Sequence, residues 1–326
     1  MKAVVARALG SPESFALEDL EPAPPGPGQI RVDVHVAGVS YVTALVAAGR
    51  YQVKPQLPFT PGGEFAGVVS AVGPSVTGFA PGDRVLAAGF GGGFAEAAII
   101  PAASALRIPT GMSFETAAVF RVAYGTAYHA LVQRAALKPG EILLVLGAAG
   151  SVGEAAIQIG KALGARVIGS GSSEAKRRAA AAAGADDTLD SHALDWRDQV
   201  NRLTGNRGVD VVFDPVGGAI TERAFRALAW RGRHLVVGFA AGSIPALPAN
   251  LALLKGAALV GVDYRQFREL EPQQETANLL ALFELHGRGL LSPTIGRVYP
   301  FAEFAAALRA ASENGPPGRI LLRIRP

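Results

Sequence analysis

Three glycines stand at the spacing of a phosphate-binding turn: Gly147, Gly150 and Gly153. They follow the apolar run Leu143 to Leu146 and precede a segment with helical periodicity. In a strand, turn and helix of this kind, glycine lets the backbone approach a pyrophosphate, and helical amides donate hydrogen bonds to its oxygens. The turn therefore predicts a dinucleotide site. Its predicted members are Gly147, Ala149, Gly150, Ser151, Val152 and Gly153.

The end of the second strand of such a domain selects the dinucleotide, because an acidic residue there bonds the ribose 2′-hydroxyl in NAD enzymes. Here the strand ends between Val167 and Ser173, in small and hydroxyl residues without an acid. Lys176, Arg177 and Arg178 follow, and hydroxyl donors with fixed positive charge bind a 2′-phosphate well. The segment predicts NADPH as the cofactor. Arg177 and Arg178 fit equally well as solvated residues of a helix face.

Composition limits the other kinds of site. The chain of 326 residues has no cysteine, which excludes disulfides, thiolate zinc sites and cysteine nucleophiles and is compatible with the cytoplasm. The formal net charge of +4 is spread along the chain, so we expect no nucleic-acid partner. We also expect no signal peptide and no membrane-spanning segment. No histidines stand at a metal-pair spacing among His35, His129, His192, His234 and His286.

Two patterns divide the chain. Up to about Ile108, short alternating runs broken by glycine and proline predict strands, as in a compact and mostly β region. After Pro139, apolar strands alternate with helices, which predicts an α/β domain with a doubly wound parallel sheet. Its six predicted strands are 142–146, 166–169, 187–189, 209–213, 234–238 and 258–262. A helix at 301–311 and a strand at 320–324 do not belong to a further strand–helix–strand unit of this kind. We therefore expect the tail to return to the first domain.

Several separated segments resemble, in order, the zinc-independent quinone oxidoreductase branch of the medium-chain dehydrogenase/reductase superfamily. Besides the Gly147 turn, they are residues 61–69, 81–85, 92–96, 124–127 and 213–218. The resemblance implies a GroES-like, mostly β catalytic domain over 1–124 and 264–326, joined to a Rossmann domain over 125–263. It also implies a cofactor in the cleft and commonly a homodimer. Zinc-dependent relatives carry Gly-His-Glu where this chain has Gly62-Gly63-Glu64, and a cysteine near Val39 or Ser40.

The resemblance further implies cofactor contacts outside the glycine turn. They are Ser40, Thr126, Ser170, Ser172, Lys176, Ser191, Pro215, Val216, Gly238, Phe239 and Tyr264. The chain departs from relatives at residues 38–43, which lack an amide and a carboxylate often found there, and this affects the choice of substrate. Arg121 interrupts an apolar stretch and fits either contact with an anionic substrate or a salt bridge at the domain junction.

The activity implied is hydride transfer from NADPH to a quinone or an α,β-unsaturated carbonyl, followed by protonation. Tyr41 and Tyr51 are candidate proton or hydrogen-bond donors, although packing explains either one as well. Two alternatives stay open at this point. One is an enoyl-thioester reductase, which uses the same chemistry, and the other is a crystallin-like NADPH-binding or RNA-binding protein.

Overall fold

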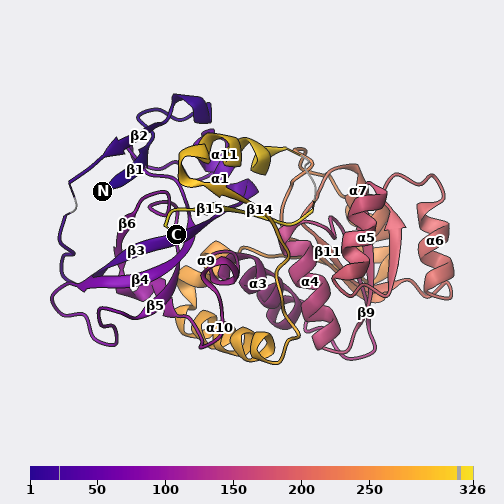
Figure 1. Cartoon of the computed structure of the whole chain (residues 1–326). Helices are drawn as coiled ribbons and strands as arrows, with labels where there is room; N and C mark the ends of the chain where they lie inside the picture. Colours follow the sequence, from indigo (N-terminus) through magenta and orange to yellow (C-terminus); the bar gives the residue numbers. More distant parts are fainter. Residues whose placement is uncertain (22, 314–316, 326) are drawn as a thin grey trace. The chain divides into compact units, whose positions relative to one another are not determined.

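The structure is a computed structural model that describes residues 1–21, 23–313 and 317–325 (Figure 1). Its contacts divide the chain into two compact units. The first unit holds Met1–Val122 together with the segment from Pro293 onward, and the second holds Ala123–Ser292. Each unit has its own sheet and its own hydrophobic core. None of the helices in the described ranges combines the length and apolar character needed to cross a membrane.

The second unit contains a six-stranded sheet with strand order β10-β9-β8-β11-β12-β13, and all neighbours in it pair in parallel. This is the order of a doubly wound dinucleotide-binding sheet, so the six predicted strands and the Rossmann fold are confirmed. The strands are β8 (Ile142–Val145), β9 (Arg166–Gly171), β10 (Asp187–Asp190), β11 (Val209–Asp214), β12 (Leu228–Val236) and β13 (Ala258–Gly261).

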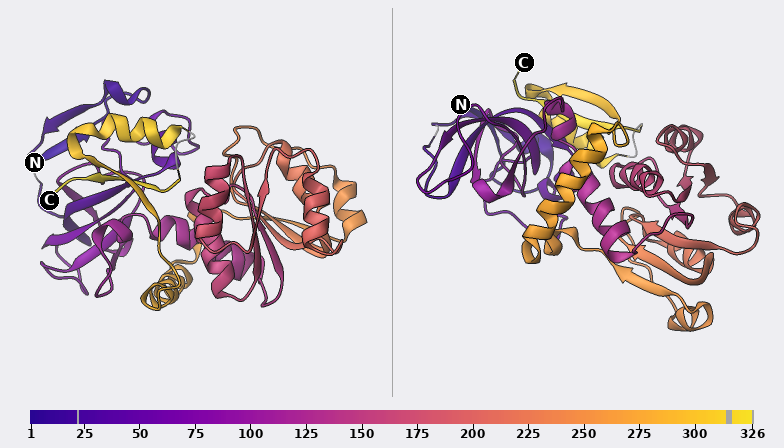
Figure 2. Two further views of the ribbon diagram at one scale, coloured as in Figure 1. Left: turned by 45° about the vertical axis from the view of Figure 1, so that its right-hand side comes forward. Right: turned by 90° about the horizontal axis from the view of Figure 1, so that it is seen from below.

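Helices lie on both sides of this sheet (Figure 2, left). Every residue of β8 and β11 is buried, as expected for strands covered on both faces. The core between sheet and helices includes Leu144, Val212 and Phe225. The helices are α3 (Arg121–Tyr128), which leads into the wider π-helical turn η3 (His129–Arg134), α4 (Ser151–Ala162), α5 (Glu174–Ala182), α6 (Trp196–Leu203), α7 (Ala219–Arg226), α8 (Ala249–Lys255), α9 (Tyr264–Leu270) and α10 (Pro272–Gly287).

The first unit is built around a mostly antiparallel sheet of order β14-β15-β3-β4-β5-β7, with β6 also paired to β3. Its core includes Val32, Phe65 and Phe94. The strands are β1 (Lys2–Val5), β2 (Ala16–Asp19), β3 (Gln29–Val39), β4 (Glu64–Val72), β5 (Arg84–Ala88), β6 (Ala97–Pro101), β7 (Ala105–Arg107), β14 (Ile295–Pro300) and β15 (Arg319–Arg323). The helices are α1 (Tyr41–Ala47), α2 (Phe114–Ala117) and α11 (Phe304–Ser312), with short 3₁₀ turns at Pro12–Ser14, Ala102–Ser104 and Phe301–Glu303.

The tail returns to the first unit as expected, because β15 pairs antiparallel with β3. The return begins later than predicted. The resemblance implies a first domain that includes 264–326, whereas residues up to Ser292 lie in the second unit. The reason is packing that local periodicity does not reveal. The ring of Phe267 stacks on His129 with 3.9 Å between centroids, and Asn278 exchanges hydrogen bonds with Gln133.

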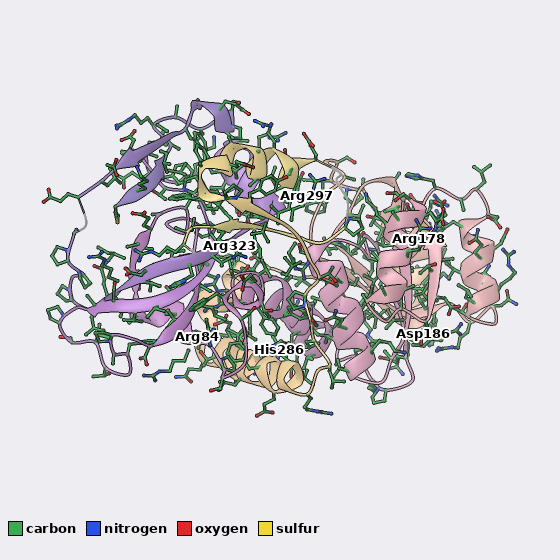
Figure 3. The ribbon with its side chains drawn as sticks, in the orientation of Figure 1. Arg84, Arg178, Asp186, His286, Arg297 and Arg323 are labelled. Atoms are coloured by element: carbon green, nitrogen blue, oxygen red, sulfur yellow. The ribbon has the colours of Figure 1, made fainter. Side chains whose placement is uncertain are left out.

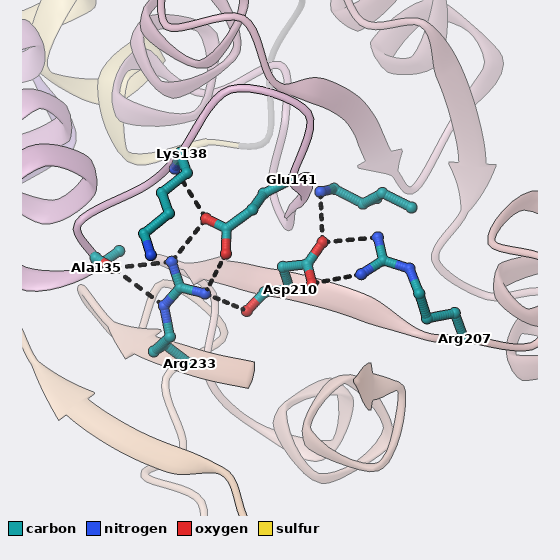
Figure 4. A network of polar contacts seen from close by, with 7 residues as sticks. Ala135, Lys138, Glu141, Arg207, Asp210 and Arg233 are labelled. Carbon is teal, nitrogen blue, oxygen red and sulfur yellow. Dashed lines mark hydrogen bonds and ion pairs between the residues drawn. The ribbon is translucent and has the colours of Figure 1, made fainter. Parts of the chain in front are cut away.

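Polar contacts join the beginnings of β8 and β11 to the middle of β12 in the second unit (Figure 4). Arg233 of β12 donates two hydrogen bonds of 2.8 Å to the carboxylate of Glu141, which directly precedes β8. Asp210 of β11 accepts a hydrogen bond from the amide of Ile142 at 2.8 Å and pairs with Arg207. These contacts lie at the opposite edge of the sheet from the carboxyl ends of the strands.

Candidate functional site

The carboxyl ends of the parallel strands collect most of the predicted cofactor residues. Parallel pairing brings these ends to one edge of the sheet, where ligands bind in doubly wound folds. The glycine turn follows β8, Ser170 and Ser172 lie at and after the end of β9, and Ser191 follows β10. The remaining residues follow β11 (Pro215 and Val216), β12 (Gly238 and Phe239) and β13 (Tyr264). The structure thus gathers within one unit residues separated by more than a hundred positions.

The turn after β8 presents free amides at the start of α4. The helix begins at Ser151, and its N-cap residue Gly150 provides no side-chain cap. The amides of the first turn, including those of Ser151 and Val152, therefore lack intrahelical acceptors. A Cβ at Gly153 would overlap the carbonyl oxygen of Gly147, so the helix can lie this close to the strand only with glycine there. Amides that point outward from a helix N-terminus fit a pyrophosphate.

The end of β9 offers a matching set of groups for a phosphate. Ser170 is 1% exposed, and its hydroxyl oxygen is buried without a hydrogen-bond partner among the described residues. A buried hydroxyl of this kind normally has a partner. The ammonium group of Lys176 donates to the hydroxyl of Ser172 at 3.3 Å. These observations fit a bound phosphate that accepts hydrogen bonds from both hydroxyls and from Lys176.

The two neighbouring arginines are already paired. Arg177 forms an ion pair of 2.8 Å with Asp190 and also donates to the carbonyl oxygen of Gly171. Arg178, which projects from α5 (Figure 3), pairs with Glu174 one helical turn away at 2.6 Å. The ion pairs of Arg177 and Arg178 agree with their interpretation as residues of a helix face and leave Lys176 as the cation beside the hydroxyls.

Three further predicted residues adjoin this edge. The amide of Ser191 donates to the carbonyl oxygen of Gly171 at 3.2 Å, which places Ser191 beside the end of β9. On the other side, a Cβ built on Gly147 would lie 2.9 Å from the side chain of Val216 and 3.6 Å from that of Pro215. The glycine turn therefore lies against the segment that follows β11.

Thr126 and Tyr264 lie near each other in the second unit. Thr126 is buried in α3, and its neighbour Gly125 packs so closely on the Tyr264 hydroxyl that a Cβ would overlap it. The Tyr264 hydroxyl donates to the carboxylate of Glu275 at 2.9 Å. Beside the end of β13, a surface cavity of about 410 Å³ is lined by residues that include His129 and Phe267.

The remaining predicted residues belong to the first unit. Ser40 is the N-cap of α1, where its hydroxyl accepts from the amide of Thr43 and its own amide donates to the Thr43 hydroxyl. Tyr41 begins the same helix and is 41% exposed. Tyr51 lies after the helix, with its ring tilted against Phe90 at 6.4 Å between centroids. Both tyrosines stay predictions as proton donors.

Arg121 and Glu64 occupy the interior of the first unit. Arg121 is 4% exposed, and its guanidinium donates to the carbonyl oxygen of Ser104 at 2.5 Å. The Glu64 carboxylate accepts from the amide of Val122 at 3.0 Å. Burial raises the pKa of Glu64 to about 7, although the amide hydrogen bond and the positive charges of Arg319 and Arg121 oppose the increase. Glu64 thus holds the start of α3 through its amide groups.

These residues do not fit a zinc ion. A zinc site uses three or four thiolate, imidazole or carboxylate ligands that converge on one point. The chain has no cysteine, and Gly63 stands where zinc-dependent relatives have histidine. Within residues 1–21, 23–313 and 317–325, no three histidine or acidic side chains gather as a metal site requires.

Asp214 and its partners were not among the predicted site residues. Asp214 lies within residues 213–218, on which the resemblance partly rests, and His234 is one of the five histidines without a metal-pair spacing. The structure shows a buried pair, with His234 Nε2 3.0 Å from the Asp214 carboxylate. One signal was present in the sequence, because an aspartate just before Pro215-Val216-Gly217 is placed to bond the amides of the turn that follows.

Comparisons with known proteins match both units. Residues 26–110 match the family model "Alcohol dehydrogenase GroES-like domain", and residues 151–284 match "Zinc-binding dehydrogenase". The mouse quinone oxidoreductase-like protein 2 is 35% identical over 314 residues, which cover 96% of this chain and 90% of that protein. Human quinone oxidoreductase is 33% identical over 309 residues, covering 94% of this chain and 92% of that protein.

A solved structure extends the likeness to three dimensions. The Escherichia coli quinone oxidoreductase, crystallised in complex with NADPH, superposes with a TM-score of 0.90 at 28% identity. The match covers 99% of this chain and 100% of that chain.

Proposed function

This chain belongs to the quinone oxidoreductase branch of the medium-chain dehydrogenase/reductase superfamily, and from that premise we propose that it reduces a quinone or a similar electron-poor carbonyl compound. It is an oxidoreductase whose cofactor is NADPH. The observation that carries the proposal is the end of β9, where two hydroxyls and Lys176 stand where an NAD enzyme has an acid. The identity of the electron acceptor is what we propose here.

The chain binds the cofactor through groups already in position. The first-turn amides of α4, at Ser151 and Val152, hold the pyrophosphate, and the 2′-phosphate accepts from Ser170, Ser172 and Lys176. With the 2′-phosphate at β9 and the pyrophosphate at β8, the strand order leaves the ends of β11 and β12 for the nicotinamide half. When bound, NADPH supplies the hydride.

The acceptor needs little acid catalysis from the protein. Reduction of a quinone yields an anion that water can protonate, so alignment and exclusion of water are the main contributions of the enzyme. Tyr41 and Tyr51 are the proposed donors of a proton or hydrogen bond. Tyr51→Phe with unchanged turnover would remove Tyr51 from this role.

The reaction proposed here uses no zinc. Support comes from the absence of cysteine and from Glu64, whose carboxylate is hydrogen-bonded to the amide of Val122. Metal analysis of purified, active protein is expected to find zinc far below one equivalent. Stoichiometric zinc that is lost together with activity on chelation would refute this part of the proposal.

The test of the proposed function is a substrate panel. NADPH oxidation at 340 nm is followed with quinones, with α,β-unsaturated ketones and with enoyl thioesters, each at several concentrations. We expect quinones or enones to give the highest kcat/KM, and NADH to be a poorer donor. A clear preference for enoyl thioesters would refute the proposed acceptor and support an enoyl reductase. No reduction of any acceptor, together with NADPH-competed RNA binding, would refute the enzymatic proposal.

We further propose a homodimer formed through the open edge of the parallel sheet. The edge strand β13 carries Leu259, which is 50% exposed. Trp230 and Leu254 of the same unit are 72% and 71% exposed, and Gly256 contacts the Trp230 ring. An open edge with exposed apolar side chains favours pairing with another chain, and a second copy offers the same edge across a two-fold axis.

Light scattering after size-exclusion chromatography tests the homodimer. The wild type is expected at twice the mass of 33.5 kDa, and Leu259→Lys is expected to shift it to the monomer. A wild type that elutes as a monomer at micromolar concentration would refute the homodimer. A location in the cytoplasm is also proposed, and cell fractionation would test it.

A further inference from the structure

Asp214 ends β11 and is the most highly hydrogen-bonded carboxylate at the candidate cofactor edge. One of its oxygens accepts from the amides of Val216 at 2.9 Å and Gly217 at 2.8 Å. The other accepts from the Thr221 hydroxyl at 2.7 Å and lies 3.0 Å from His234 Nε2. Although burial raises its pKa, the hydrogen bonds from His234, Gly217 and Thr221 bring the pKa of Asp214 below its usual value. Asp214 is therefore a buried anion that four donors stabilise.

The backbone of Asp214 also joins the two loops that follow β11 and β12. Its carbonyl oxygen accepts from the amides of Val237 at 2.9 Å and Gly238 at 3.3 Å. The next carbonyl oxygen, that of Pro215, accepts from the amide of Ala240 at 3.1 Å. Through its side chain and its main chain, Asp214 thus contacts both segments that carry predicted cofactor residues.

The loop after β11 needs such an anchor. Gly217 and Gly218 have positive φ angles of 69° and 66°, a conformation that glycine adopts easily but does not maintain by itself. A Cβ at Gly217 would lie 2.8 Å from the Phe239 ring, so the two loops touch at this point. A shift of the glycine turn would therefore move Phe239 as well.

We propose that Asp214 is a positioning residue for hydride transfer, which holds the loops after β11 and β12 so that Pro215, Val216, Gly238 and Phe239 orient the nicotinamide half of the cofactor. This inference rests on the proposed function, which places that half at these strand ends. The adenosine half binds at β8 and β9, so Asp214 affects the two halves unequally.

The experiment compares Asp214→Asn with Asp210→Asn. Both residues are buried carboxylates of β11, but Asp210 lies at the opposite end of the strand, where it bonds Ile142 and Arg207 (Figure 4). A purely structural role would make the two variants alike. Asparagine at position 214 cannot accept from all four donors, because its amide nitrogen is itself a donor.

For D214N we expect kcat with NADPH to fall by about 10- to 100-fold, the range that small misplacements of reacting groups produce. Its affinity for 2′,5′-ADP, which occupies only the adenosine half, should stay as in the wild type. In the cofactor-free protein, hydrogen exchange at the amides of Val216, Gly217 and Gly238 should be faster in D214N and unchanged in D210N. D210N should lower the unfolding midpoint while keeping the wild-type kcat.

If D214N does not fold, Thr221→Val tests the same inference, because it removes only the hydroxyl that donates to Asp214 and changes the shape of the side chain little. It should reduce kcat less than D214N, and Thr221→Ser, which keeps the hydroxyl, should restore the wild-type exchange rate at Gly217. The inference is overturned by unchanged kcat and exchange in D214N, by an equal kcat loss in D210N, or by loss of 2′,5′-ADP binding in D214N. Failure of the wild type to bind 2′,5′-ADP would instead overturn the proposed cofactor site.

Discussion

We expect the preference for NADPH to depend most on Lys176. Its ammonium group donates to the Ser172 hydroxyl and has no carboxylate partner among the described residues, so it is available to a 2′-phosphate. Arg177 and Arg178, the next two residues, each form an ion pair with an acid of the second unit. Lys176→Met keeps the aliphatic stem and removes the charge. We expect this variant to bind NADPH more weakly and NADH unchanged.

The size of the effect follows from exposure and geometry. A fully exposed ion pair contributes less than about 1 kcal/mol, whereas a hydrogen bond to a charged group contributes about 1.5–3 kcal/mol. Lys176 is half-buried, and the phosphate that we expect it to meet would also be held by the buried Ser170 hydroxyl. A value near the lower part of that range, about 1–2 kcal/mol, corresponds to roughly a 5- to 30-fold loss of NADPH affinity.

The assay is a fluorescence titration of the wild type, K176M and Arg178→Met with both dinucleotides. R178M is the matched control, because it removes a neighbouring charge from the same helix that pairs with Glu174. The R178M variant should bind NADPH and NADH with nearly the dissociation constants of the wild type. Added salt should narrow the difference between wild type and K176M, since part of the interaction is screened. An equal loss of NADH and NADPH affinity in K176M, or a larger NADPH loss in R178M, would refute the reasoning.

Three further predictions concern stability. Glu64→Gln should abolish the pH dependence that Glu64 gives to the free energy of unfolding. Burial raises the pKa of Glu64 from 4.5 to about 7. The resulting stabilisation of roughly 3 kcal/mol is therefore complete below pH 4.5 and is lost as the pH rises through 7. Urea unfolding of the wild type and of Glu64→Gln at pH 5 and pH 8 measures this pH dependence. An equal change in the free energy of unfolding between the two pH values in both proteins would contradict the prediction. Gly153→Ala should destabilise by about 1–3 kcal/mol through overlap with Gly147 and remove the thermal shift on adding NADPH. Arg233→Met should cost about 2 kcal/mol in urea unfolding at pH 7. That cost should shrink in acid, because its hydrogen bonds to Glu141 hold the pKa of that carboxyl below its usual value despite burial, and a constant cost down to pH 3 would count against this account.

Much of the second unit could be predicted from the sequence, because a buried parallel strand is apolar throughout and a glycine turn has a fixed spacing. Strand Ile142–Val145 lies within a residue of its predicted bounds, and helix Ser151–Ala162 follows the glycine turn as predicted. The strand predicted at 234–238 instead spans Leu228–Val236. Its first half carries the exposed side chains of Trp230 and Arg231, so it lacks the continuous apolar run from which a buried strand is predicted.

The helices after β13 show where local pattern fails. Nothing in the periodicity of residues 264–292 indicates which domain they pack on. The deciding contacts, Phe267 on His129 and Asn278 on Gln133, join positions more than a hundred residues apart. Domain boundaries in a chain that returns to its first domain are set by such long-range contacts, which the sequence does not show.

The same limit applies to the charges that select the cofactor. In the sequence, Lys176, Arg177 and Arg178 are adjacent cations, and only the resemblance favours Lys176 as the one that meets a phosphate. Only the pairing of β10 with β9 brings Asp190 to Arg177, and only the helix brings Glu174 to Arg178. We therefore expect the specificity of this site to depend on ion pairing, because the fold pairs two of the cations with acids and leaves Lys176 beside the hydroxyls. A sequence with the same three residues but without Asp190 would present a different site, so Asp190→Asn should strengthen NADPH binding by freeing Arg177, and titration of that variant beside K176M would show whether pairing decides the selection.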